Sequence, residues 1–282
     1  MTESLGTLFS GSNQFFKTHI NPILIGALVF GIIIGSMQYV LERKMMHSVQ
    51  NHMGEIEQME DLVERMEAGD PTAFEEMMNE MGVSEDGTAE VNTAKSAQIA
   101  EGFIKGVMPT FAVFFVIMIL VSMTSSVYFL LLVIRNAQSA GSVFSEIQGY
   151  IFPMIGLWIW MFLRSFVWIP LLGFVIAIFI GPRLALAPVI LLRENKGVLE
   201  STRQSYTMSR GYWGKITGNL LVMALCVWVV MMIALVAAGA ITAFVPVLGM
   251  TIMSVLQYVS MAYGTIFTVR LSDTILQNPL KK

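Results

Sequence analysis

The chain has 282 residues, of which 55% are hydrophobic and 13% charged, and its formal net charge is −3. Soluble domains carry about 25% charged residues, so this composition excludes an ordinary water-facing surface and indicates an integral membrane protein. The single cysteine, Cys226, excludes a disulfide framework within one chain. No nucleic-acid partner is expected.

Residues 1–20 are predicted to form a short interfacial helix on the cytoplasmic face, with Lys17 and His19 at the lipid headgroups. A helix needs about 20 predominantly apolar residues to cross a bilayer. Six stretches meet this requirement, so the predicted fold is all-α and polytopic: Pro22–Val40 (within a first span at 21–43), Val107–Ile134, about Tyr150–Trp168, about Leu171–Leu192, Ile216–Gly239 and about Val247–Val269. Tight turns are predicted at Ile169-Pro170 and at Phe244-Val245-Pro246.

The distribution of lysine and arginine predicts the orientation. Ten basic residues fall in the N-terminal segment, in loops 135–149 and 193–215 and in the C-terminal tail, whereas the two short loops on the opposite side have none. Short loops rich in Lys and Arg stay in the cytoplasm. Both termini are therefore predicted to be cytoplasmic, in the inner membrane of a prokaryote.

An acidic module, residues 44–106, is predicted to lie outside the cytoplasm between the first two spans, with residues 107–282 forming the rest of the membrane domain. The stretch 41–106 holds 15 of the 20 acidic residues and eight methionines. Apolar residues recur there at helical spacing, so the first helix is expected to continue to about Glu67. Asp70-Pro71 is a helix-start signal, and Thr93 begins a predicted return helix. The module is thus expected to be a helical hairpin.

The composition of this module is compatible with metal binding or with packing and protein contacts. Its methionines suit a soft metal such as Cu(I), and His47, His52 and Glu55 suit harder ions. Methionine is also an adaptable packing residue, so no metal or other cofactor is expected. The favoured alternatives are packing within the module and contact of residues 45–106 with a protein partner or a second copy.

Arg183 is the main candidate for a polar site, because it lies inside the fourth apolar stretch. Charges at membrane depth are costly and usually mark function. Gly181-Pro182 just before it is predicted to break or kink the helix. In the alternative interpretation the span ends near Gly181, Arg183 is interfacial, and residues 184–192 form a surface helix or a capped extension. Arg164, near the outer end of the third span, is expected to snorkel without a functional role.

Residues 198–213, within the cytoplasmic loop 193–215, are predicted to form an amphipathic helix on the membrane surface. Val198, Leu199, Thr202 and Tyr206 lie near its apolar side. The candidate contacts with lipid and the interface are Arg203, Arg210, Tyr212 and Trp213.

The run RLALAPVILLRENKGVLESTRQSYTMSRGYWGKI resembles the signature of the glycerophosphoryl diester phosphodiesterase membrane-domain family and of related uncharacterised six-helix inner-membrane proteins. GTLFSGSNQFFKTHINPILIGALV and SAGSVFSEIQGY are similar to the family's opening segment and to its loop after helix two. The resemblance implies the topology of this membrane region. It does not imply phosphodiesterase activity, because no catalytic barrel is expected after the last span.

The sequence does not predict an enzyme, because no Walker loop, nucleophile elbow or HExxH pattern is present. The first functional hypothesis is a scaffold, accessory subunit or envelope-homeostasis factor that acts through protein–protein contacts. The alternative is a transporter or lipid-handling protein with its site near Arg183.

Overall fold

The computed structural model describes residues 4–68, 70, 72–73, 76, 93–166 and 179–277. Every regular element in these ranges is a helix, and the same ranges contain no strand. Five helical segments are long and apolar enough to cross a bilayer: Ile20–His47, Met108–Ile134, Ala140–Arg164, Trp213–Phe244 and Pro246–Gln277. They coincide with five of the six predicted spans. The first half of the remaining one, with the turn at Ile169-Pro170, lies outside the described residues.

Helix α1 (Leu5–Thr18) begins where the Ser4 side chain accepts a hydrogen bond from the Thr7 amide at 3.2 Å. Its end differs from the expectation for His19, which is only 3% exposed instead of reaching the headgroups. The imidazole stacks on Phe15, with 4.0 Å between the ring centroids. Its Nδ1 lies 3.1 Å from the Phe15 carbonyl and its Nε2 lies 2.8 Å from the Gln138 amide nitrogen. These contacts hold the junction between α1 and the next helix.

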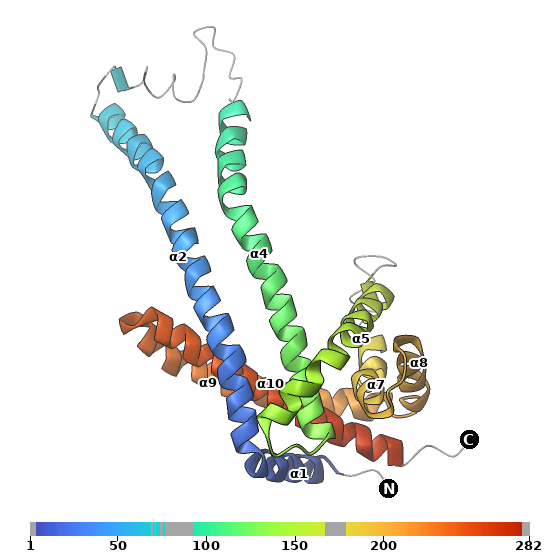
Figure 1. Cartoon of the computed structure of the whole chain (residues 1–282). Coiled ribbons are helices and arrows are strands. Elements are labelled where there is room, and N and C mark those ends of the chain that lie inside the picture. The colour runs from blue at the N-terminus through green and yellow to red at the C-terminus, as the bar shows by residue number, and fades with distance from the viewer. Residues whose placement is uncertain are drawn as a thin grey trace. The chain divides into compact units, whose positions relative to one another are not determined.

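Two helices continue beyond their apolar spans. Helix α2 (Ile20–Glu67) ends at the residue that the helical periodicity predicted, and α4 (Thr93–Ile134) begins at the predicted Thr93. Contacts divide the chain into two compact units, which we describe separately: unit 1 comprises Met1–Ser36 and Met118–Lys282, and unit 2 comprises Met37–Ile117. Figure 1 traces both helices along the chain.

In unit 2, a charged cluster follows the end of α2. Arg65 donates hydrogen bonds to Asp70 at 3.0 Å and to Glu76 at 2.9 Å. Asp70 also accepts the Thr72 amide hydrogen at 2.9 Å, as expected of a helix N-cap. Hydrogen bonds from Thr72, and then the contact with Arg65, lower the pKa of Asp70 to about 2. The rest of the predicted short helix, the loop at 82–90 and the side chains of His52 and Glu55 lie outside the described residues.

In unit 1, α2 packs closely on helix α10 (Pro246–Gln277). A Cβ atom added to Gly31 would lie 2.7 Å from the Val255 Cα, and one added to Gly35 would lie 2.6 Å from the Thr251 Cα. The two glycines are four residues apart, so they form one smooth face on α2. Small residues at this spacing let membrane helices approach to backbone contact, and here the approach is made within one chain.

The start of α2 is also fastened to the end of α4. The buried Tyr128 hydroxyl donates a hydrogen bond to the Pro22 carbonyl at 2.7 Å, and its ring lies over Gly26, where a side chain would not fit. Tyr128 belongs to the main core cluster, which also contains Ile23, Phe30 and Tyr258. This core joins the first, second and last spans.

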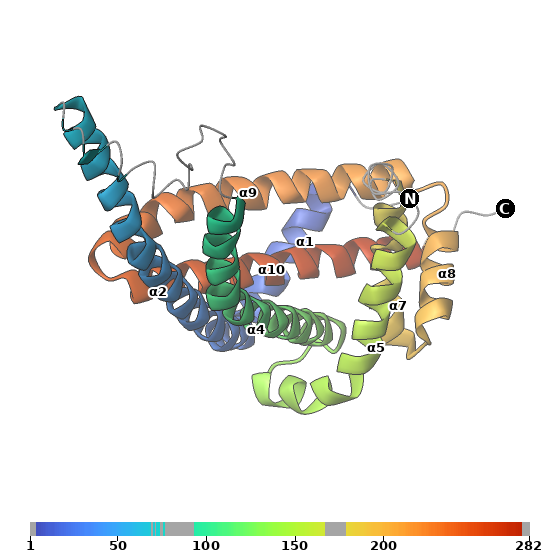
Figure 2. The ribbon, with the colours of Figure 1, turned by 90° about the horizontal axis from the view of Figure 1, so that it is seen from above.

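Helix α5 (Ala140–Phe166) begins ten residues before the predicted third span, because the stretch expected to be a loop up to residue 149 is helical from Ala140. The connection to α4 is therefore short, and it includes Asn136 in the left-handed conformation, with φ of 50°. Pro153 lies inside α5. Proline removes one backbone hydrogen bond from the helix interior. Figure 2 shows that α5 changes direction along its length.

The region of the predicted fourth span is interrupted. Residues 179–184 are helical, residues 185–186 form a turn, and α7 (Ala187–Glu194) follows. A break was expected at Gly181-Pro182, but those two residues lie inside the helical turn and the break comes later. In the alternative interpretation, the surface helix at 184–192 is wrong, since Leu184, Leu186, Ala187 and Val189–Leu192 are buried; the interfacial position of Arg183 stays a prediction.

The last three helices are α8 (Val198–Met208), α9 (Trp213–Phe244) and α10. Helix α8 packs on α7 and α5, and α9 packs along α10 as an antiparallel pair (Figure 2). No residue in the most apolar window of α9 is buried, which fits a helix that faces lipid on most of its circumference. Helix α1 lies against α10.

Candidate functional site

The broken fourth helix is held by hydroxyl groups of α8. The turn at residues 185–186 interrupts the helical hydrogen bonds, so the Arg183 carbonyl needs a partner from elsewhere. The Ser205 hydroxyl donates to this oxygen at 2.6 Å and the Ser209 hydroxyl at 3.4 Å. Both serines are fully buried. The buried side of α8 is therefore polar and serves to position Arg183.

The Arg183 side chain is bound to Tyr206, which lies on α8 next to Ser205. Its Nη1 donates a hydrogen bond to the Tyr206 hydroxyl oxygen at 2.6 Å, and its Cζ lies 4.9 Å from the centre of the ring. The Nε–H of Arg183 is buried and has no hydrogen-bond partner in the described part of the chain. Arg183 is thus half-buried with one donor unused.

A second arginine reaches the same ring. The Cζ of Arg164, from α5, lies 5.3 Å from the centre of the Tyr206 ring. Both guanidinium groups are within the range of about 6 Å over which a cation is attracted to an aromatic face. Tyr206 therefore brings two positive charges together.

Among the described residues, no carboxylate accompanies this pair. The sequence has no acidic residue between Glu146 and Glu194, and the one acid on α8, Glu200, lies 3.6 Å from Lys196 instead. In the described ranges, neither Arg164 nor Arg183 forms a salt bridge. Two cations without a counter-ion make an electrostatic environment that favours an anion.

The depth of this cluster differs from the expectation for Arg164. A Cβ added to Gly156 of α5 would lie 3.4 Å from Val198 at the start of α8, and Arg164 contacts Tyr206 near its end. Helix α8 therefore runs beside α5 in the same direction. Arg164 and Tyr206 therefore lie at the same height along α5, whereas the predicted topology has them at opposite faces of the membrane.

The predicted amphipathic helix is correct in part. It ends at Met208 rather than at residue 213, and Leu199, expected on its apolar side, is 63% exposed. The buried side consists of Ser201, Thr202 and Ser205, because α8 packs on α5 and α7 through small side chains.

The four predicted interface residues separate into two groups. The Trp213 indole N–H donates to the Phe179 carbonyl at 3.0 Å, and the two rings stack with centroids 5.5 Å apart. Tyr212 is half-buried against the smaller core cluster around Phe267. Arg203 and Arg210 are exposed. The structure thus brings Trp213 to the broken helix and leaves Arg203 and Arg210 on the surface.

Gly181 and Pro182 do not contribute polar groups to the cluster. Both are half-buried, and a Cβ added to Gly181 would have no atom within 4 Å. Sequence reasoning missed Arg164, Ser205 and Tyr206 as parts of the site. The sequence did hold one signal for them: Arg164 and Arg183 lie in apolar stretches, and no acidic residue lies between Glu146 and Glu194 to pair with them.

The turn between α7 and α8 carries a second group of charges. Lys196 lies 2.7 Å from Glu194, and Gln204 donates to the same carboxylate at 3.1 Å. The hydrogen bond from Lys196 is the chief reason that the pKa of Glu194 lies below its ordinary value, and the Glu194 carboxylate raises the pKa of Lys196. Arg193 pairs with Asp273 of α10. This network fixes the polar end of the α7–α8 hairpin.

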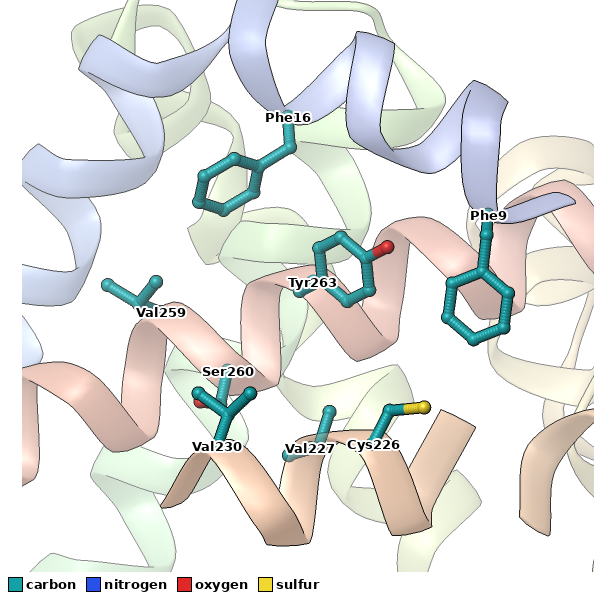
Figure 3. Close-up of a pocket in the computed structure, with 8 residues that line it drawn as sticks. All are labelled: Phe9, Phe16, Cys226, Val227, Val230, Val259, Ser260 and Tyr263. Carbon is teal, nitrogen blue, oxygen red and sulfur yellow. The ribbon is translucent and has the colours of Figure 1, made fainter. Parts of the chain in front are cut away.

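An apolar pocket of about 310 Å³ lies between α1, α9 and α10. Figure 3 shows its wall, which consists of two phenylalanines of α1, three residues of α9 and three of α10: Phe9, Phe16, Cys226, Val227, Val230, Val259, Ser260 and Tyr263. It is distinct from the arginine pair, with which it shares no residue.

Among the described residues, no group of three His, Cys, Asp or Glu side chains is arranged to hold a metal ion. Comparison of the chain with protein-family models, with curated proteins and with solved structures finds no match.

Proposed function

We propose that this chain is a non-enzymatic integral membrane protein that handles lipids and binds an anionic group, the phosphate of a lipid headgroup, between Arg164 and Arg183. The observation that carries the proposal is the convergence of both guanidinium groups on Tyr206 without a carboxylate. Arginine forms strong, directional hydrogen bonds with phosphate oxygens. An anion at this place would also compensate two charges that are costly in apolar surroundings.

The membrane setting belongs to the same proposal. Five apolar helices and a sixth span through residues 171–192 would place both termini in the cytoplasm of a prokaryotic cell, according to the basic residues. The α7–α8 hairpin would then enter the membrane from the cytoplasmic face, since α8 runs beside α5. The resemblance to the glycerophosphoryl diester phosphodiesterase membrane-domain family is consistent with this topology, and we propose membership on that ground alone.

Binding of phosphatidylglycerol to the purified full-length protein tests the proposal. Phosphatidylcholine and inorganic phosphate are the comparison ligands, and native mass spectrometry counts the bound molecules. Arg183→Gln and Arg164→Gln are each expected to weaken phosphatidylglycerol binding about tenfold, which corresponds to about 1.4 kcal/mol. Lys17→Gln and Arg135→Gln are the matched controls, because both side chains are exposed and belong to other parts of the chain than α5 and α8.

The outcomes separate the possibilities. Equal binding by all four variants would refute the site. Binding of inorganic phosphate with the same dependence on Arg164 and Arg183 would identify a soluble anion instead of a lipid headgroup, and it would favour transport.

A specific observation supports the second candidate, a scaffold or accessory subunit. The α2 helix continues from His47 to Glu67, and α4 begins at Thr93, well before its apolar span starts at Met108. Helices that continue as polar segments offer a surface for a protein partner or a second copy. Affinity purification in mild detergent, with and without residues 45–92, tests this role. A defined partner or oligomer that only the intact chain retains would support it, whereas identical lone monomers would exclude it.

A further inference from the structure

The pocket between α1, α9 and α10 is suited to a hydrocarbon chain. Its wall has only two hydroxyl groups, and both are engaged elsewhere. Ser260 donates to the sulfur of Met231 at 3.2 Å, and Tyr263 donates to the Asn13 side-chain oxygen at 2.8 Å. A buried water needs two to four polar partners, and this wall has none to spare. The pocket therefore favours an apolar occupant over water or a polar ligand.

The position of the pocket identifies the medium from which this occupant comes. Cys226 and Val230 are exposed on α9, and the same helix exposes Val229 and Ile233 nearby. The apolar wall is thus continuous with the surface of α9 that faces lipid. On the opposite side it is bounded by Phe9 and Phe16, which are seven residues apart on α1 and therefore share one face (Figure 3).

We propose that the pocket holds the acyl chain of a membrane phospholipid, which enters from the bilayer between α1 and α9. An amphipathic helix such as α1 lies at the boundary between headgroups and acyl chains, so a pocket beneath it is at the level where a lipid chain begins. A void of this size would lose the packing contacts of its whole lining. An acyl chain supplies these contacts without requiring a polar partner. This inference concerns a site separate from the arginine pair and does not rest on the proposed function.

The first test uses the full-length protein in nanodiscs of phosphatidylcholine, with a fraction of the lipid carrying a photoactivatable diazirine in its acyl chain. After irradiation, mass spectrometry locates the cross-links. They are expected on α1 and α10 beside the pocket, as well as on the outer face of α9. Phosphatidylcholine is chosen because it carries no net charge, so failure of the headgroup proposal would not affect this result.

The second test fills the pocket with a large side chain, so that an acyl chain can no longer enter. Ser260→Trp is expected to lose the cross-links on α1 and α10 and to keep those on the outer face of α9. Ile233→Trp is the matched control, because Ile233 is 68% exposed and lies outside the pocket; it is expected to keep all cross-links. Cross-links on α1 and α10 that persist in Ser260→Trp, or that never occur in the unaltered protein, would overturn the proposal.

Cys226 gives a second measurement that needs no substitution. It is the only cysteine in the chain and it lines the pocket. Its alkylation by N-ethylmaleimide is expected to accelerate severalfold when lipid is replaced by a bile-salt detergent, whose rigid ring system is too wide for a site shaped for one chain, and to slow again when phosphatidylcholine is added. A rate that is independent of lipid would contradict the proposal. A Cys226–Cys226 disulfide between two chains would also contradict it, because a second copy would then cover the pocket.

Discussion

At the scale of single residues, Tyr206 is the centre of the candidate site. Its hydroxyl accepts a hydrogen bond from Arg183, and its ring lies close to both Arg183 and Arg164. One side chain therefore positions two cations that belong to different segments. The arginines have no competing carboxylate on these segments, so their orientation depends on Tyr206.

Replacing Tyr206 by phenylalanine tests this dependence. The ring is kept but the acceptor is lost, so the free energy of unfolding is expected to fall by about 1.5–3 kcal/mol, as for other hydrogen bonds to charged groups. Thermal unfolding in detergent measures the change. Tyr150→Phe is the control, because the Tyr150 hydroxyl accepts from Arg135 in an exposed position and should matter less. Equal effects would show that burial does not strengthen the Arg183 bond.

The residues of the site were predictable only in part. Arg183 was identified because a charge in an apolar stretch is unusual whatever surrounds it. Tyr206 and Ser205 gave no such signal, since tyrosine and serine are ordinary in an amphipathic loop. Their roles arise from the packing of α8 on α5 and α7, and a sequence pattern carries no information about which helices are neighbours.

At the scale of elements, the contact of α2 with α10 is close enough to bring backbone against backbone. Gly31 and Gly35 allow it, because any side chain at these positions would meet the backbone of α10. In the sequence the two glycines are only a small-residue pair at a four-residue spacing, which does not reveal the partner helix. The structure shows that the partner is the last span of the same chain.

Gly31→Ala is expected to destabilise the protein by about 1–3 kcal/mol, since overpacking at a backbone contact forces the helices apart. Gly239→Ala is the opposite case. A Cβ at Gly239 would have no atom within 4 Å, so this variant should be neutral or more stable by up to about 1 kcal/mol, because alanine favours the helix. Unfolding temperatures of the two variants give the comparison. Similar losses in both would mean that the crossing is not closely packed.

The α7–α8 turn is expected to respond to pH. The folded-state pKa of Glu194 is lowered, so its contribution to stability is present above the ordinary value of 4.5 and is lost as the pH falls through the lowered value. The pKa of Lys196 is raised, so its contribution is present below the ordinary value of 10.5 and is lost as the pH rises through the raised value. The turn should therefore be most stable between these limits.

The difference in unfolding temperature between the unaltered protein and Glu194→Gln isolates this effect. It should be constant near neutral pH and should disappear in acid. A difference that persists at pH values well below 4.5 would mean that the Glu194 charge does not stabilise the turn.

The sequence predicted whole elements better than their interruptions. Five spans were found because apolar length is a strong signal, and α2 was followed to Glu67 by its periodicity. The break was misplaced at Gly181-Pro182, since both residues lie within the helical stretch 179–184. The turn at residues 185–186 comes directly before Pro188 in the first turn of α7, and this proline cannot donate a backbone hydrogen bond to the preceding turn. Ser205 and Ser209 then bond the Arg183 carbonyl.

At the scale of the whole molecule, the orientation in the membrane is the main expectation. Cysteine labelling tests it in a Cys226→Ala background. Gly87→Cys is expected to react with a membrane-impermeant maleimide on intact cells, because residue 87 belongs to the predicted outer module. Ser139→Cys should react only after permeabilisation, since Ser139 is exposed in the predicted cytoplasmic loop 135–149. The reverse pattern would invert the topology and contradict the rule of positive loops.

The contact between the first and last spans has a consequence for biogenesis. The ribosome delivers α2 to the membrane long before residues 251–255 exist, so the face around Gly31 and Gly35 has no partner during most of synthesis. Helix α1 also lacks its partner at this stage, because it packs on α10. Contacts between residues so distant in the chain form late. During synthesis, the Gly31 and Gly35 face of α2 therefore lacks its packing partner until α10 has been made. Slow synthesis of α10 would prolong the time for which this face can pack against another helix.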